Sequence, residues 1–137
     1  HLPALHRAQA VQKKAAKVGF DWPGIAGVLD KIDEELAELR QALHAGDDAA
    51  VAEELGDLLF AVVNLSRFRK HQAEELLHAT VRKFERRFMA MEAILGTAGR
   101  RLEECTLEEM DRAWNQAKAD ARARSSGQAL DPVPAPR

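Results

Sequence analysis

Apolar residues recur every three or four positions along several stretches of the chain, and this spacing predicts amphipathic helices. The stripe over residues 25–45 is the clearest, and it consists of Val28, Leu29, Ile32, Leu36, Leu39 and Leu43. No alternating pattern of the kind that predicts strands is found, and no internal repeat. The pattern predicts five helices, at about 2–18, 25–45, 47 or 48–68, 72–95 and 106–124.

Local signals place the ends of these helices. Gly46 is a typical C-terminal stop, and Asp47 or Asp48 is a suitable N-cap for the next helix. Thr106 followed three residues later by Glu109 forms a capping box. The break near His71 carries no Gly or Pro, so it is the least marked of the boundaries.

Long helices joined by short loops indicate an all-α fold, and we expect an antiparallel helical bundle. We expect one domain over residues 1–124. Residues 125–137 are rich in Pro and small residues, and they are predicted to form a disordered tail.

The composition excludes several classes of protein. Apolar residues make up 46%, charged residues 31%, and the net charge is −2. This balance gives no broad reason to expect binding to a nucleic acid polymer or an anionic membrane. The apolar runs are far shorter than the ~20 residues that a membrane helix needs. The single cysteine, Cys105, excludes an internal disulfide and a cysteine zinc site, and such usage suits the cytoplasm.

Two pairs of acidic residues stand at helical spacing. Glu35 and Glu38 are three positions apart, and so are Glu54 and Asp57 on the following helix. A short loop joins the two helices, so four carboxylates converge if the pairs face each other. Taken alone, each pair also fits an ordinary solvated helix face.

Asp57 fits a solvated face poorly, because it lies within the apolar run "LGDLLFAVV". Only a thin polar stripe of Glu54, Asp57 and Asn64, with Ala61 between, crosses that helix. A buried carboxylate needs either a basic partner or a divalent cation. All-oxygen ligands would favour Mg²⁺ or Mn²⁺, but the spacing does not choose between a metal and an ion-pair network. A di-iron site is excluded, since E-x-x-H occurs only once.

A basic ridge follows in "RKFERRF", where Lys83, Arg86 and Arg87 share a helix face. These cations either form surface ion pairs or bind the phosphates of an anionic substrate. Lys31 lies one turn before Glu35. Trp114 lies at a position of its helix that is expected to face the core, so packing is its default role. The alternative is that its ring offers a stacking surface for a base.

Several segments together resemble the MazG nucleoside triphosphate pyrophosphohydrolases. They are "LPALHRAQAVQKKA", "KVGFDWPG", "KIDEELAEL", "EELGDLLFAVVNLSRF", "KFERRF" and "LEEMDRAW", in order over about Leu2 to Lys118. The chain looks most like the catalytic carboxy-terminal half of two-domain members, which fits its start at His1 rather than at Met.

The resemblance implies an all-α NTP pyrophosphatase fold, a homodimer, and Mg²⁺-dependent cleavage of NTPs and dNTPs to a nucleoside monophosphate and pyrophosphate. The metal ligands and catalytic residues that it implies are Glu35, Glu38, Glu54 and Asp57. The nucleotide contacts that it implies are Lys31, Glu34, Glu53, Lys83, Arg86, Arg87 and Trp114.

In the expected mechanism, water attacks the α-phosphorus and Glu34, Glu38 or Glu53 orients that water or takes its proton. Broad-specificity cleansing of the nucleotide pool is the favoured function. Two alternatives stay open: a non-catalytic dimerisation or regulatory module, and a pyrophosphatase narrowly specific for dUTP or a modified dNTP.

Overall fold

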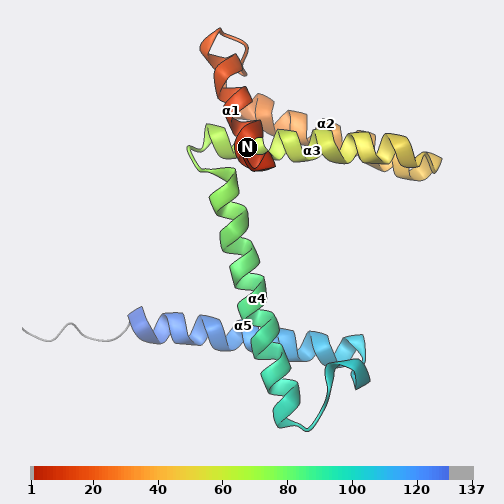
Figure 1. The fold of residues 1–137 in the computed structure, drawn as a ribbon, viewed down its shortest axis with the longest axis vertical. Helices are drawn as coiled ribbons and strands as arrows, with labels where there is room; N and C mark the ends of the chain where they lie inside the picture. Colours follow the sequence, from red (N-terminus) through yellow and green to blue (C-terminus); the bar gives the residue numbers. More distant parts are fainter. Residues whose placement is uncertain (1, 130–137) are drawn as a thin grey trace, which may run out of the picture. The chain divides into compact units, whose positions relative to one another are not determined.

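Helices form all the regular structure in residues 2–129, the part of the chain that the structure, a computed structural model, describes (Figure 1). This agrees with a sequence rich in strong helix formers. The elements are α1 (Ala4–Lys17), α2 (Ile25–Ala45), α3 (Asp48–Phe68), α4 (Ala73–Thr97), the short 3₁₀ helix η1 (Leu102–Glu104) and α5 (Leu107–Ala129).

The turn between α2 and α3 follows the predicted signals. Gly46 takes a left-handed conformation with φ of 69°, which a side chain would disfavour. The Asp47 side chain then accepts a hydrogen bond from the Ala50 backbone N–H at 3.1 Å, as an N-cap does. Because this connection is so short, α2 and α3 lie side by side (Figure 1).

The break between α3 and α4 falls where it was predicted, around His71, and a tertiary contact explains it. Lys70 adopts a left-handed φ of 60°, which is uncommon for a residue other than glycine. The Gln9 side chain from α1 donates to the His71 carbonyl at 2.8 Å and accepts from the Ala73 N–H at 2.9 Å. Gln9 therefore satisfies backbone groups that the turn leaves unpaired.

Contacts within the described residues group the chain into one unit up to His78 and another from Ala79. In the first unit α2 packs on α3 and α1 packs on α3. Its buried apolar side chains are Val28, Leu39, Ala42, Ala61, Val63 and Ala73. The expected single domain over 1–124 and the antiparallel bundle stay predictions.

The second unit has a small core formed by Met91, Leu95 and Ala113, with Trp114 and Cys105 packed against it. The predicted capping box opens α5. Thr106 Oγ1 accepts from the Glu109 N–H at 3.2 Å, and the Glu109 carboxylate accepts from the Thr106 N–H at 3.4 Å. The Cys105 thiol, at the flank of this helix, contacts the Arg101 carbonyl at 3.2 Å.

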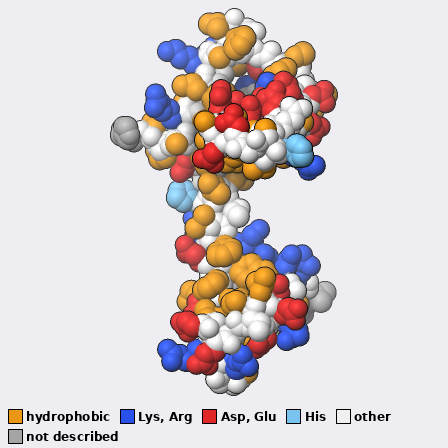
Figure 2. Space-filling model, turned by 90° about the vertical axis from the view of Figure 1, so that its right-hand side faces the viewer, with side chains coloured by type: hydrophobic (Ala, Val, Ile, Leu, Met, Phe, Trp, Pro, Cys, Tyr) orange, Lys and Arg blue, Asp and Glu red, His pale blue; other side chains and the backbone are white. Residues whose placement is uncertain are grey.

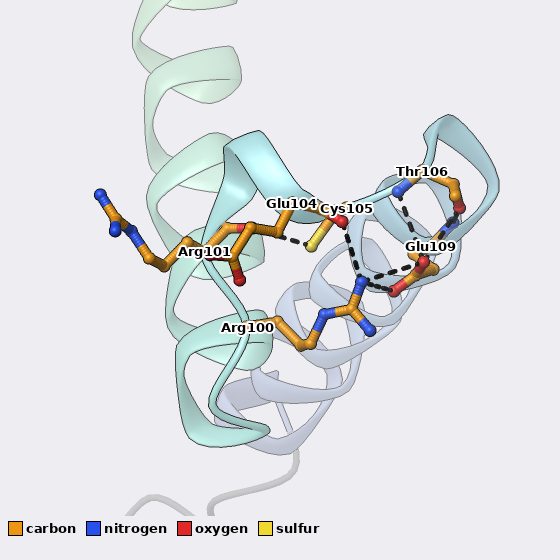
Figure 3. Close-up of polar contacts among 6 residues, drawn as sticks. All are labelled: Arg100, Arg101, Glu104, Cys105, Thr106 and Glu109. Carbon is orange, nitrogen blue, oxygen red and sulfur yellow. Dashed lines mark hydrogen bonds and ion pairs between the residues drawn. The ribbon is translucent and has the colours of Figure 1, made fainter.

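Arg100 braces the same helix start, as Figure 3 shows. Its guanidinium lies 2.9 Å from Glu109 Oε2 and donates to the Glu104 carbonyl at 3.0 Å. The hydrogen bond from the Thr106 backbone, together with the Arg100 charge, lowers the pKa of Glu109 although burial opposes the shift.

The predicted end of the last helix, near Arg124, falls short of the observed end. α5 runs to Ala129, because Ser and Gly weaken a helix without breaking it and the first proline beyond it is Pro132. Residues 130–137 of the predicted tail lie outside the described residues.

Many large apolar side chains lie on the surface of both units (Figure 2). Leu59 is 60% exposed on α3, and Phe84 and Met89 are 56% and 69% exposed on α4. Among the helices of residues 2–129, none has the length and apolar character required to span a membrane.

We expect Thr106→Ala to lower the free energy of unfolding by about 1 kcal/mol at neutral pH, because it removes the N-cap hydroxyl. Urea denaturation measures this loss. Thr80→Ala, at an exposed position inside α4, is the control, and it should not lower the free energy of unfolding. Equal stability of the two variants would contradict the capping role.

Glu109→Gln should lower the free energy of unfolding by an amount that depends on pH. Because the folded pKa of Glu109 is lowered, the carboxylate stabilises the fold above its unfolded pKa of about 4.3. That contribution is lost as the pH falls through the folded pKa. Denaturation between about pH 7 and pH 3 should therefore show the difference from wild type shrinking, and a constant difference would be evidence against it.

Candidate functional site

Three carboxylates from two neighbouring helices meet in the first unit. Glu35 and Glu38 come from α2 and Glu54 comes from α3, and one oxygen of each lies within 4.8 Å of the others. The shared face of Glu35 and Glu38 follows from their spacing, and the pairing of α2 with α3 brings in Glu54. Glu35 is buried and the other two are half-buried. Figure 2 shows the wider gathering of acidic side chains on this unit.

Lys31 balances part of this charge. Its ammonium lies 2.9 Å from Glu35 Oε1 and 3.5 Å from Glu34 Oε2. The hydrogen bond from Lys31 is the main reason that the pKa of Glu35 is lowered, although burial opposes it. The same contact raises the pKa of Lys31. One of the three clustered carboxylates, Glu35, thus takes part in an ion pair within α2.

Glu54 behaves in the opposite way. Burial, followed by the nearby Glu38 and Glu35 carboxylates, raises its pKa to about 7. Oε2 of Glu35 and Oε2 of Glu54 are both buried, and neither has a hydrogen-bond partner within the described part of the chain. Buried polar atoms are normally paired, so these two oxygens need a cation or a donor that the described residues do not supply. A divalent cation that prefers oxygen ligands fits this set.

The structure corrects the argument made from Asp57. The sequence predicted a carboxylate buried among apolar residues, but Asp57 is exposed. Its neighbours Leu55, Leu59 and Phe60 are themselves 45%, 60% and 48% exposed. Asp57 lies one turn beyond Glu54 and outside the group of three that lies within 4.8 Å. The structure therefore brings together three of the four predicted ligands.

A cleft of about 540 Å³ begins beside the cluster. Lys31, Glu35 and Asp57 line part of it. The remaining walls come from α1, the loop between α1 and α2, and α3, and they are formed by Val11, Gln12, Ala15, Phe20, Asp21, Trp22, Phe60, Ala61, Asn64 and Arg67. Of the stripe predicted on α3, Asp57, Ala61 and Asn64 line the cleft, whereas Glu54 is not among its lining residues.

Several cleft residues were missed at the sequence level. Arg67 continues the stripe three residues after Asn64, so helical spacing alone could have found it. Gln12 and Asp21 carry no such signal, because they reach the cleft only through the packing of α1 and its loop on α3.

The other residues predicted to contact the nucleotide belong neither to the carboxylate cluster nor to the cleft lining. Glu34 and Glu53 are exposed next to Glu35 and Glu54. Lys83 and Arg86 are exposed and Arg87 half-buried in the second unit. Trp114 packs in that unit, with its ring centroid 5.2 Å from that of Phe84. A role in nucleotide binding for these residues stays a prediction.

One family model and several known proteins match this chain. Residues 25–90 match the family model described as the MazG nucleotide pyrophosphohydrolase domain. A Thermotoga maritima nucleoside triphosphate pyrophosphohydrolase/pyrophosphatase MazG is 45% identical over 117 residues, which is 85% of this chain and 45% of that protein. The Escherichia coli K12 nucleoside triphosphate pyrophosphohydrolase is 47% identical over 121 residues, with the same coverage of 85% and 45%.

A third relative, the uncharacterized protein YabN of Bacillus subtilis, is 46% identical over 69 residues, which is 50% of this chain and 14% of that protein. The chain spans less than half the length of each of these curated relatives. The matched segment, residues 25–90, contains all three residues of the carboxylate cluster. With 45% and 47% identity over most of its length, the chain belongs to the MazG family.

Proposed function

We propose that this chain hydrolyses nucleoside triphosphates to a nucleoside monophosphate and pyrophosphate with a divalent cation. The observation that carries the proposal is the cluster of Glu35, Glu38 and Glu54 beside a cleft of about 540 Å³. Two of the relatives are named nucleoside triphosphate pyrophosphohydrolases, which supports the reaction class.

Glu35, Glu38 and Glu54 would hold Mg²⁺ or Mn²⁺, with Asp57 as a further ligand from the next turn of α3. The unpaired buried oxygens of Glu35 and Glu54 are the atoms that such an ion would satisfy. When bound, the cation polarises phosphate oxygens and lowers the pKa of water.

The chain's own side chains supply the remaining steps. Water attacks the α-phosphorus, its proton passes to a carboxylate, and the bond to the β-phosphate breaks to release pyrophosphate. Glu34, Glu38 and Glu53 are the candidates for the proton acceptor. Lys31 lies beside the cluster and can pair with a phosphate oxygen. We assign Lys83, Arg86 and Arg87 to the leaving pyrophosphate and Trp114 to the nucleoside.

We further propose that the chain works as a cytoplasmic homodimer of antiparallel helical bundles with broad nucleotide specificity. The exposed apolar side chains of α3 and α4, such as Leu59, Phe84 and Met89, support a second copy as the partner. Nothing in its charge favours a nucleic acid polymer or a membrane as a partner, since the net charge is −2.

We expect Glu35→Gln and Glu54→Gln each to reduce Mg²⁺-dependent pyrophosphate release by about 100-fold or more, because each removes a charged ligand. A coupled assay for pyrophosphate with mixed NTPs measures this. Asp33→Asn is the matched control, since Asp33 is an exposed carboxylate on the same helix and outside the cluster.

Near-normal release by both Gln variants would refute the assignment of the cluster. A wild-type chain that binds Mg²⁺ but releases no pyrophosphate from any NTP would favour the non-catalytic module instead. Release from dUTP or a modified dNTP alone would favour the narrow-specificity enzyme.

Cation binding should depend on pH through Glu54. Its folded pKa of about 7 lies above the unfolded value of about 4.3, so without a cation its contribution to stability is present below about pH 4 and is lost as the pH rises through 7. Mg²⁺ binds the ionised form and releases a proton. The rise in melting temperature caused by Mg²⁺ should therefore be larger at pH 8 than at pH 6.

Thermal denaturation with and without Mg²⁺ tests this, and calorimetry in buffers of different ionisation enthalpy measures the released proton. Glu54→Gln should lose most of the pH dependence, whereas Asp33→Asn should retain it. An equal Mg²⁺ effect at both pH values in the wild type would show that Glu54 does not couple to the ion.

A further inference from the structure

The junction between α3 and α4, residues 69–72, interrupts a sequence that favours a helix. α3 ends at Phe68 and α4 begins at Ala73. The residues between them read "RKHQ" and include neither Gly nor Pro. Arg, Lys and Gln are good helix formers, and Ala and Glu follow them in the chain. Local preference alone would therefore run α3 into α4 as one continuous helix.

The backbone of the junction forms the hydrogen bonds of a Schellman motif, which usually has glycine at its left-handed position. The His71 N–H donates to the Ser66 carbonyl at 2.9 Å, and the Lys70 N–H donates to the Arg67 carbonyl at 3.0 Å. Lys70 occupies the left-handed position, with φ of 60°. A side chain raises the energy of this conformation, so other contacts have to stabilise the bend.

Gln9 of α1 supplies these contacts. Its Nε2 donates to the His71 carbonyl at 2.8 Å, and its Oε1 accepts from the Ala73 N–H at 2.9 Å. In a continuous helix the Ala73 N–H would pair with the Arg69 carbonyl, and the His71 carbonyl would pair with the Glu75 N–H. One side chain thus replaces two hydrogen bonds that the bend removes.

The position of Gln9 depends on how α1 packs on α3. Gln12 lies three residues later on the same face of α1, and its Nε2 donates to the Phe60 carbonyl of α3 at 2.8 Å. Gln12 is buried. Together the two glutamines connect α1 to α3 and to the junction. A displacement of α1 would therefore withdraw Gln9 from both of its backbone partners.

We propose that residues 69–72 form a two-state hinge, which Gln9 holds bent and which closes into one continuous α3–α4 helix when Gln9 is withdrawn. The left-handed Lys70 and the helix-forming sequence favour the straight state, whereas the two Gln9 hydrogen bonds favour the bent state. A bistable element of this kind converts a small displacement into a large one. Through it, α1 controls the start of the helix that bears Lys83, Arg86 and Arg87.

Spin labels within one chain measure the state of the hinge. Ala52 on α3 and Glu75 on α4 are both exposed, so Ala52→Cys and Glu75→Cys carry the labels. Cys105, the single native cysteine, is changed to Ser. In one straight helix the two labelled positions lie about 35 Å apart, and a bend shortens this distance. Diluting the labelled chain with unlabelled chain removes distances between copies.

Wild type should give one short distance. Gln9→Ala should raise the ratio of straight to bent chains by about 10-fold or more, because it removes two hydrogen bonds, and a second population should appear at about 35 Å. Gln9→Glu keeps the acceptor for the Ala73 N–H and should give a smaller second population, so it serves as the test if Gln9→Ala does not fold. Gln41→Ala, the same change at an exposed position of α2, is the matched control.

Hydrogen exchange separates straightening from fraying. In a continuous helix the N–H groups of Gln72 and Ala73 pair with carbonyls four residues earlier, so their exchange in Gln9→Ala should be no faster than in wild type. Adding Lys70→Gly to Gln9→Ala should restore the short distance, because glycine accepts a left-handed φ and weakens the straight helix. A general loss of structure would not be reversed by glycine.

Three results would overturn the hinge. They are an unchanged distance in Gln9→Ala, faster exchange at residues 72 and 73 without a population at about 35 Å, and a long-distance population that Lys70→Gly does not reduce.

A last readout rests on the proposed function. Pyrophosphate release should fall in Gln9→Ala and recover when Lys70→Gly is added, since α4 carries the basic ridge. Unchanged release from a straightened chain would contradict this link between the hinge and the reaction. A wild type that releases no pyrophosphate would refute the proposed function, and the label distances would still decide the hinge.

Discussion

The packing of α2 against α3 is the constraint on which the rest of this protein depends. A two-residue connection through Gly46 and Asp47 forces the helices together, and buried apolar residues on both helices hold them there. That contact places Glu54 against Glu35 and Glu38, although like charges repel. Apolar burial offsets the repulsion in the folded chain.

The electrostatics of the cluster follow from one imbalance. In the part of the chain that the structure describes, the Lys31 ammonium is the cation that pairs with this cluster of three carboxylates. The carboxylate that it contacts, Glu35, has a lowered pKa, while Glu54, on the far helix, has a raised one. Opposite shifts within one cluster are typical of functional sites, and they agree with membership of a family described by nucleotide pyrophosphohydrolysis.

One face of α3 joins this charged cluster to the rest of the cleft. Asp57, Ala61, Asn64 and Arg67 succeed one another along it, from the acidic end to the ion pair with Asp21. In the proposed function, the triphosphate of the substrate lies at the acidic end of this face.

The sequence by itself determined the features that depend on near neighbours. It gave the bounds of α2 and α3, the capping box at Thr106 and the shared face of Glu35 and Glu38, because hydrogen bonds within a turn and helical spacing act over a few residues. Only the tertiary structure decided that Asp57 is exposed, that Gln9 pairs with the backbone between α3 and α4, and that Arg67 meets Asp21. Those outcomes depend on which helix faces pack together, and local pattern does not encode that choice.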